Sequence, residues 1–149
     1  MTPLPDPPPT FSAGALSSDA LPGTLRRLVL VVDDEPYINL LITSILKLNG
    51  CDVLSAANGE EALGVLAEHP QIAAIVTDLH MPMMDGFGLL AALRTHEQPL
   101  PVVVVTARGA ESDQRRSMEL GARALLTKPF SRQQLWGVVA PLLGLTDAP

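Results

Sequence analysis

Four short apolar runs in this chain each stop abruptly at polar residues. Continuous runs rich in Val, Ile and Leu are typical of strands that are buried on both faces of a parallel sheet. The carboxyl ends of such strands meet at one edge of an open α/β sheet, and ligands bind there. We therefore expect three carboxylates, a hydroxyl and an ammonium group to meet in one crevice. The runs are Leu28–Val32 before Asp33 and Asp34, Ile72–Thr77 before Asp78, Val102–Val105 before Thr106, and Leu125–Thr127 before Lys128.

A helix-like segment follows each strand candidate, so the chain reads as five βα units. Asn58 stands three residues before Glu61, and Ser131 stands three residues before Gln134; both pairs are typical of helix starts. Right-handed crossovers place helices on both faces of a parallel sheet, which predicts a doubly wound, three-layer α/β fold. The predicted strands are 28–32, 53–55, 72–77, 101–106 and 124–127, and the predicted helices begin near Pro36, Asn58, Asp85, Glu111 and Ser131.

The order of the strands decides whether the polar groups meet. In the order 2-1-3-4-5, the first, third, fourth and fifth strands are consecutive neighbours, and their ends bring Asp34, Asp78 and Lys128 together. The other common doubly wound order, 3-2-1-4-5, would separate Asp78 from Asp34. We expect the order 2-1-3-4-5.

The composition limits the classes of protein to which the chain can belong. A length of 149 residues favours one domain, and the formal charge is −6. Because phosphate electrostatics dominate nucleic-acid affinity, this charge predicts no nucleic-acid partner. No apolar run reaches the roughly 18 residues that span a bilayer, so we expect no membrane partner. The single cysteine, Cys51, cannot form an internal disulfide, which predicts a reducing, cytoplasmic compartment.

The beginning of the chain differs in composition from the rest. Residues 1–25 hold six of the fourteen prolines and neither Lys nor Arg. Such a composition predicts a disordered or extended tail, and it lacks the basic start and apolar core of a signal peptide. We expect the folded domain to span residues 26–145 and a short C-terminal tail to occupy residues 146–149.

The grouped side chains suit a hard divalent cation and a phosphoryl group. Mg²⁺ prefers oxygen ligands and accepts one or two carboxylates, so Asp34 and Asp78 are candidate direct ligands and Asp33 a direct or water-mediated one. Asp78 is also a candidate nucleophile toward phosphorus. Lys128 is placed to neutralise charge on phosphoryl oxygens, and Thr106 to donate a hydrogen bond to one of them.

Four segments together resemble the receiver domain of two-component response regulators. They match this family in order and spacing, and the resemblance covers Leu28 to about Leu143. It implies a flavodoxin-like fold and leaves no room for an output domain, so we expect a stand-alone receiver. The segments are Val31–Glu35, Asp78–Gly86, Thr106-Ala107 and Lys128–Phe130.

The resemblance implies a role for each acid. Asp78 matches the phosphoacceptor, which takes phosphate from a phosphohistidine on a histidine kinase or a histidine phosphotransfer protein. Asp33 and Asp34 match the acidic pair that binds Mg²⁺. The backbone carbonyl of His80 matches a further metal ligand, with Asp78 completing the set.

The resemblance also implies a signalling module rather than an enzyme with an external substrate. Thr106 matches the hydroxyl that shifts toward the phosphate, and Lys128 matches the lysine that pairs with it. The bond between Lys128 and Pro129 is implied to be cis. Such a module catalyses only its own phosphorylation and dephosphorylation, and it acts on a downstream protein target as a monomer or weak homodimer.

Leu125 departs from the family pattern, which places Tyr or Phe three residues before the lysine. Either Leu125 repacks inward as a smaller lever, or the chain acts chiefly as a phosphate carrier. Similarly, the His80 side chain either controls the access of water to the phosphate or has no role. Two other functions stay open: a constitutive protein-binding module with receiver architecture, and a Mg²⁺-dependent phosphohydrolase, which a chain without a cap domain disfavours.

Overall fold

The computed structural model describes residues 26–95, 99–107 and 111–145. The predicted tails, residues 1–25 and 146–149, lie outside this part of the chain. Strands and helices alternate throughout it, as the sequence predicts. The elements are β1 (Leu28–Val32), α1 (Pro36–Leu48), β2 (Asp52–Ala56), α2 (Gly59–Glu68), β3 (Ala74–Thr77), α3 (Gly86–Leu93), β4 (Val102–Thr106), α4 (Glu111–Glu119), β5 (Ala124–Thr127) and α5 (Arg132–Leu142).

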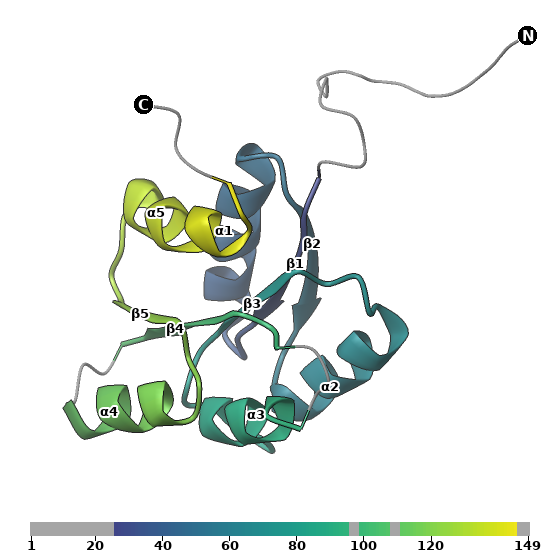
Figure 1. Ribbon diagram of the computed structural model, residues 1–149. Coiled ribbons are helices and arrows are strands. Elements are labelled where there is room, and N and C mark those ends of the chain that lie inside the picture. The colour runs from purple at the N-terminus through teal and green to yellow at the C-terminus, as the bar shows by residue number, and fades with distance from the viewer. Residues whose placement is uncertain (1–25, 96–98, 108–110, 146–149) are drawn as a thin grey trace, which may run out of the picture.

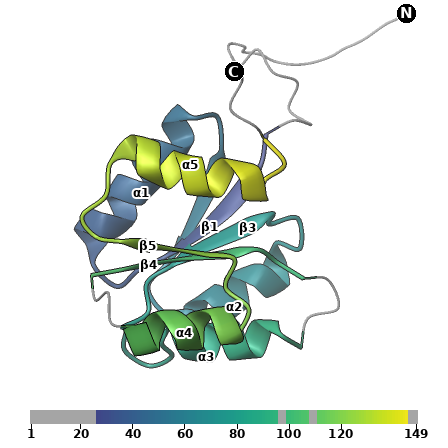
Figure 2. The ribbon, with the colours of Figure 1, turned by 60° about the vertical axis from the view of Figure 1, so that its left-hand side comes forward.

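The five strands form one parallel sheet in the order β2-β1-β3-β4-β5, which confirms the predicted order. Helices α1 and α5 cover one face, and α2, α3 and α4 cover the other (Figures 1 and 2). The fold is therefore the three-layer, doubly wound sandwich expected from right-handed crossovers.

The core consists of two apolar layers, one on each face of the sheet. Successive side chains of a strand point to opposite faces, so each central strand supplies both layers. In β1, Leu30 packs on the side of α2 and α3, whereas Val29 and Val31 pack on the side of α1 and α5. This two-sided burial explains why the central strands read as unbroken apolar runs rather than as alternating ones.

Three strands differ in their bounds from those predicted. Strand β2 is one residue longer at each end than 53–55, β3 begins at Ala74 rather than at Ile72, and β4 begins at Val102 rather than at Pro101. Ile72 is buried, but its amide bonds to His69 O at 3.1 Å and so belongs to the preceding turn. Apolar character alone does not separate a buried turn residue from the first residue of a strand.

Side-chain caps define the starts of three helices. Asn58 accepts a hydrogen bond from Glu61 N, and Asp85 accepts one from Gly88 N. Ser131 and Gln134 form a reciprocal capping box at the start of α5, as predicted. Each cap satisfies an amide that has no partner within its helix, and so fixes where the chain leaves the sheet edge.

The loop between β3 and α3 is folded tightly against the backbone at Asp78. Gly86 N donates to Leu79 O at 2.8 Å. A side chain at Gly86 would fall against the carbonyl oxygen of Asp78 and lie 2.9 Å from Leu79 Cα. The absence of a Cβ at Gly86 therefore lets the first residue of α3 pack directly on Asp78, the residue that follows β3.

Within the described residues, no helix is long and apolar enough to cross a bilayer.

We expect Gly86→Ala to lower the free energy of unfolding by about 1–3 kcal/mol, because the added methyl group must displace backbone. Gly137→Ala is the matched control: Gly137 lies within α5, and a Cβ there has no neighbour within 4 Å. We expect the control to gain about 0.5–1 kcal/mol from helix propensity. Urea denaturation of both variants measures the difference, and an equal effect of the two would contradict the tight packing at Gly86.

Candidate functional site

Strand register brings the predicted polar residues to one edge of the sheet. Val32 pairs with Thr77, so the residues that follow them, Asp33 and Asp78, lie side by side beyond β1 and β3. Thr106 pairs with Thr127 in the same way, which places Thr106 beside Lys128. The site thus arises where four neighbouring strands end, as the strand order requires.

Three carboxylates meet at this edge. Asp33, Asp34 and Asp78 each offer an oxygen, and these oxygens all lie within 4.8 Å of one another. Asp33 and Asp78 are buried, with 2% and 8% of their surface exposed, whereas Asp34 is exposed. The cluster therefore has two acids set into the protein and one facing solvent.

Asp33 is held from several sides. Its Oδ1 accepts a hydrogen bond from Glu35 N at 2.9 Å, and its Oδ2 accepts one from Lys128 Nζ at 3.2 Å. Burial nevertheless raises the pKa of Asp33 above its ordinary value, and the charge of Asp78 raises it further. The two hydrogen bonds and the charge of Lys128 act against this rise without cancelling it.

Lys128 lies between the two buried acids. Its Nζ is 3.2 Å from Asp33 Oδ2 and 3.5 Å from Asp78 Oδ2, and only 13% of its side chain is exposed. Burial alone would lower the pKa of Lys128, but the carboxylates of Asp78 and Asp33 outweigh it and raise this pKa above the ordinary value. The ammonium group therefore stays charged and offsets part of the repulsion between the acids.

The carboxylate of Asp78 is oriented by its neighbours. Leu79 N donates to Asp78 Oδ1 at 2.7 Å, and Asp78 N donates to Val32 O at 2.9 Å. One carboxylate oxygen thus faces a backbone amide and the other faces the ammonium of Lys128.

Thr106 and His80 differ in the exposure of their side chains at the site. Thr106 is fully buried at the end of β4, and its carbonyl oxygen accepts a hydrogen bond from Lys128 N at 2.9 Å. The side chain of His80 is exposed, and its Nε2 lies 3.3 Å from Asp113 Oδ2 on α4. The bond between Lys128 and Pro129 is cis, as the resemblance implies.

The donor set suits a hard divalent cation. Three carboxylate oxygens within 4.8 Å of one another offer the ligand type that Mg²⁺ prefers, and the exposed Asp34 leaves one side open to water and a phosphoryl oxygen. Three acids against one ammonium leave excess negative charge, which a cation would neutralise. The residues present therefore fit a magnesium ion.

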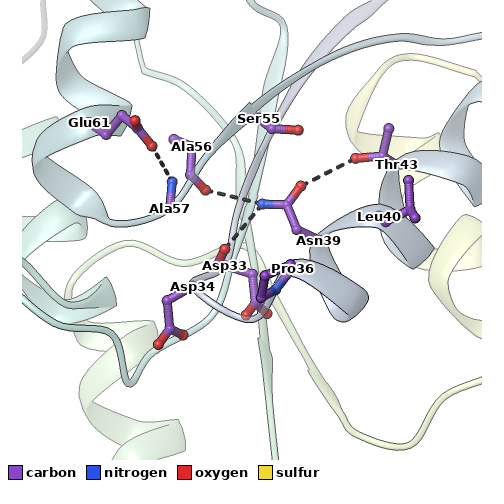
Figure 3. Close-up of a pocket in the computed structure, with 10 residues that line it drawn as sticks. All are labelled: Asp33, Asp34, Pro36, Asn39, Leu40, Thr43, Ser55, Ala56, Ala57 and Glu61. Carbon is purple, nitrogen blue, oxygen red and sulfur yellow. Dashed lines mark hydrogen bonds between the residues drawn. The ribbon is translucent and has the colours of Figure 1, made fainter.

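A hollow of about 360 Å³ opens beside the acids, between α1 and the end of β2 (Figure 3). The amide of Asn39 stands in its wall and donates to Asp33 O and Ala56 O, both at 3.1 Å. Leu40 follows Asn39 in α1, and 64% of its surface is exposed. The acidic cluster is therefore continuous with a solvent-exposed groove along α1. The hollow is lined by Asp33, Asp34, Pro36, Asn39, Leu40, Thr43, Ser55, Ala56, Ala57 and Glu61.

Three residues near the site have no sequence signal that marks them. Asn39 ties the end of β1 to the end of β2, Gly86 packs on Asp78, and Asp113 contacts His80 from a helix 33 residues away in the chain. A lone Asn, Gly or Asp in a helical segment is too common to single out. Only the tertiary structure, which brings separate helices and strands together, shows that these three residues lie at the site.

Comparisons with known proteins agree with this geometry. The model of the response regulator receiver domain family matches residues 29–140. A probable transcriptional regulator, ycf27 of Cyanophora paradoxa, is 38% identical over 125 residues, which cover 83% of this chain and 51% of the relative. The transcriptional regulatory protein PhoP of Bacillus subtilis, named for alkaline phosphatase synthesis, is 37% identical over 80% of this chain and 49% of the relative. The chain thus spans about half the length of these curated relatives.

Solved structures of similar proteins have the same fold. A putative response regulator from Chloroflexus aurantiacus superposes with a TM-score of 0.76 at 32% identity, covering 80% of this chain and 98% of the other. A chain of the CheX–CheY–BeF3–Mg²⁺ complex from Borrelia burgdorferi gives a TM-score of 0.74 at 29% identity, covering 78% of this chain and 88% of the other.

These relatives overturn the expectation that no nucleic acid is a partner. Several of them are transcriptional regulators, and transcription is regulated on nucleic acid. The expectation was wrong because the net charge of the chain bears only on direct contact between its own surface and nucleic-acid phosphates. It says nothing of regulation through another module or another protein.

We expect Lys128→Met to lower the free energy of unfolding by about 2 kcal/mol at pH 7, because it leaves a buried carboxylate without its ammonium. The pKa of Lys128 is raised on folding, so its stabilisation is complete below the unfolded value of about 10.5 and is lost as the pH rises through the higher folded value. Urea denaturation at pH 7 and above pH 10.5 should show the difference shrinking. Lys47→Met, which removes an exposed lysine of α1, is the control; an equal loss there would contradict the pairing.

Proposed function

Since this chain belongs to the response regulator receiver domain family, we propose that it accepts a phosphoryl group on Asp78 from a phosphohistidine of a partner protein. Receiver domains of two-component systems are phosphoacceptor signalling modules rather than classical enzymes. The observation that supports this function best is the approach of Lys128 Nζ to both Asp33 and Asp78 beside the exposed Asp34.

Asp78 acts as the nucleophile in this proposal. One carboxylate oxygen forms a bond to phosphorus while the bond between phosphorus and the donor nitrogen breaks, and the imidazole leaves with the electron pair. The amide of Leu79, 2.7 Å from Oδ1, orients the carboxylate for this attack. A bound Mg²⁺, held by Asp33, Asp34, Asp78 and the backbone carbonyl of His80, would supply charge neutralisation at the phosphoryl oxygens.

Lys128 and Thr106 serve the phosphoryl group once it is on Asp78. The ammonium group already faces the Asp78 carboxylate at 3.5 Å, so it can pair with an added phosphoryl oxygen after a small movement. Thr106 is the last residue of β4, at the same edge of the sheet. Its hydroxyl donates a hydrogen bond to a second oxygen of the phosphoryl group. These are the roles that the resemblance to the family implies for Lys128 and Thr106.

The surface around the acids suits a protein partner. Three large apolar side chains are exposed on the segments that border the cluster: Tyr37 and Leu40 on α1, and Met83 in the β3–α3 loop. Exposed apolar side chains around a polar centre are typical of protein interfaces. We propose a histidine kinase or a histidine phosphotransfer protein as the donor and a downstream protein as the target. A phosphohydrolase of small molecules fits less well, because the groove beside the acids is open along α1.

We also propose that the chain works in the cytoplasm. Cys51 is free and buried, and burial raises the pKa of its thiol to about 11, which makes it a poor nucleophile. As the single cysteine of the chain, it cannot form an internal disulfide, which agrees with a reducing compartment. A stand-alone receiver that acts as a monomer or weak homodimer remains our prediction, and the transcriptional role of the relatives is a property of those proteins.

One observation favours a second candidate, a constitutive protein-binding module. Leu125 packs partly buried against the core layer beneath α2 and α3, where it offers neither a ring nor a hydroxyl. A module without phosphorylation-dependent change would bind its partner equally with and without a beryllofluoride adduct. Partner binding measured in both states separates the two candidates.

We expect the protein to form one acyl phosphate when incubated with Mg²⁺ and a small phosphodonor, because the amide of Leu79 orients the Asp78 carboxylate beside the solvent-facing Asp34. Intact mass spectrometry should show a gain of one phosphoryl group that is lost in base. Asp78→Asn should show none, whereas Asp52→Asn, which changes an exposed acid at the other end of β2, should match the wild type. Absence of the adduct from the wild type would rule out the phosphotransfer function.

We expect Asp34→Ala to weaken Mg²⁺ binding at least about tenfold, because it removes the solvent-facing ligand of the cluster. Lys128→Ala should bind Mg²⁺ nearly as well as the wild type but accept phosphate more slowly. Calorimetric titration with Mg²⁺ measures the affinity of each variant. Glu60→Ala removes an exposed acid outside the cluster and serves as the control. Unchanged affinity in Asp34→Ala would place the ion elsewhere.

A further inference from the structure

A second groove lies between the end of α1 and the start of α5, which pack on the same face of the sheet (Figures 1 and 2). Its volume of about 360 Å³ suits a small molecule or a few residues of an extended chain. Leu48 is 72% exposed here, and the Trp136 ring is partly buried against the core layer beneath α1 and α5. We call it the α1–α5 groove; it is lined by Leu48, Asn49, Arg132, Gln133 and Trp136.

The polar groups of the α1–α5 groove include several hydrogen-bond donors without partners. Within the described part of the chain, the Arg132 guanidinium, the Gln133 amide and the Trp136 indole N–H make no hydrogen bond or ion pair. The N–H of a partly buried Trp usually has a partner. None of the lining residues carries a carboxylate, so the groove presents a positive charge and donors beside an apolar surface. Such a groove suits a ligand with an apolar body, many acceptors and a negative charge.

Residues 3–9 of the chain have this character. Their sequence is Pro-Leu-Pro-Asp-Pro-Pro-Pro, and Asp6 is the only charged side chain among them. Because proline lacks an N–H, the segment has seven backbone carbonyl acceptors but only two N–H donors, on Leu4 and Asp6. Proline favours the polyproline II conformation, and Pro-rich segments of this kind bind grooves lined by aromatic side chains. The segment, which lies outside the described residues, therefore matches the groove in polarity and charge.

The first described residues, Arg26 and Arg27, lie close to both walls of the α1–α5 groove. Arg26 Nη2 donates to Cys51 O at 3.4 Å, and Cys51 is two residues beyond Asn49 in the first wall. Arg27 Nε donates to Leu143 O at 3.1 Å, at the end of the helix that forms the second wall. The start of β1 thus lies beside the ends of α1 and α5 (Figures 1 and 2).

The distance from this point to the α1–α5 groove is short compared with the length of the preceding chain. Trp136 in the groove is seven residues, or about 10 Å, along α5 from Leu143. Residues 10–25 connect Pro9 to Arg26, and a chain of this length spans up to about 50 Å when extended. Residues 3–9 can therefore reach the groove of their own chain.

We propose that residues 3–9 bind in the α1–α5 groove of their own chain, with the prolines against Trp136 and Leu48 and the Asp6 carboxylate beside the Arg132 guanidinium. The covalent link favours this binding, because a linked segment has an effective concentration on the order of 1 mM. A segment that binds as a free peptide with a Kd of about 0.1 mM then occupies the groove about nine-tenths of the time.

This binding gives the face formed by α1 and α5 a cover that belongs to the chain itself. A protein that needs this face must displace the segment. The inference goes beyond the phosphotransfer function and does not depend on it.

A second copy of the chain fits the α1–α5 groove less well than the attached segment does. Stable protein interfaces bury about 800 Å² on each partner, whereas this groove is a small hollow lined by five residues. Two copies would also each bring a net charge of −6, and like charges repel. The attached segment brings a single acid to an unpaired guanidinium.

Acrylamide quenching of tryptophan fluorescence in the chain of 149 residues tests the proposal, because Trp136 is the only tryptophan and lines the groove. In Asp6→Lys we expect the quenching constant to rise about twofold, since release of the segment uncovers the ring. Asp19→Lys changes the net charge equally and should match the wild type. Acrylamide is neutral, so the changed charge does not itself alter its access to the ring.

Charge exchange identifies the contact with Arg132. We expect Arg132→Glu to raise the quenching constant as Asp6→Lys does, and the double variant Asp6→Lys/Arg132→Glu to return it close to the wild-type value. Arg123→Glu reverses an exposed guanidinium outside the groove and should match the wild type. Equal quenching in Asp6→Lys and the wild type, or no recovery in the double variant, would overturn the proposal.

Glycine substitutions test the role of the prolines. Pro7→Gly/Pro8→Gly should raise the quenching constant, because glycine removes the preference for polyproline II. Ala13→Gly/Ala15→Gly adds the same number of glycines outside the segment and should leave the constant unchanged. Equal constants in the two double variants would contradict binding through the prolines.

Dilution separates the chain's own segment from a second copy. The quenching constant of the wild type should stay the same between about 0.5 and 50 µM protein, because binding within one chain does not depend on concentration. A constant that falls as the protein concentration rises would place a second copy in the groove and overturn the proposal.

Discussion

The interaction of Lys128 with Asp33 and Asp78 is the contact on which the site depends. Three carboxylates within 4.8 Å repel one another, and two of them are buried, where charge is most costly. The ammonium group at 3.2 and 3.5 Å offsets part of this cost, although burial still raises the pKa of Asp33. The balance leaves a pre-formed excess of negative charge, which suits a divalent cation and, once charge is neutralised, a phosphoryl group.

The fold keeps this arrangement stiff on one side and leaves it compliant on the other. Strand pairing and two buried apolar layers fix the backbone at Asp33 and Asp78, and Gly86 holds the next loop against the sheet edge. Helix α4 contacts that loop through Asp113, which meets His80, and contacts the start of α3 through Arg116, which meets Phe87. A rigid chemical centre beside a helix that buries only Ser117 suits signalling, because the chemistry needs fixed geometry and the output needs an element that can move.

The charged residues of the sequence predict which side chains meet at the sheet edge, but the net charge does not predict the partners. The acids and the lysine that end separate strands were expected to meet, and they do, because register places strand ends side by side. The net charge of −6 predicts no nucleic-acid partner, and transcriptional regulators among the relatives contradict that prediction. The neighbours of a strand end are fixed by strand pairing. A net charge, in contrast, is a sum over the whole surface, and different parts of that surface have different roles.

The sequence by itself determined the order of strands and helices, the helix caps at Asn58 and Ser131, and the identity of the groups at the strand ends, because apolar runs and capping patterns are local properties of the chain. Only the tertiary structure decided that β3 begins at Ala74, that Asn39 joins two strand ends, and that Asp113 and Arg116 contact the loop after Asp78. These features depend on distances between elements far apart in the chain, and such distances follow from how whole helices pack on the sheet rather than from any one segment.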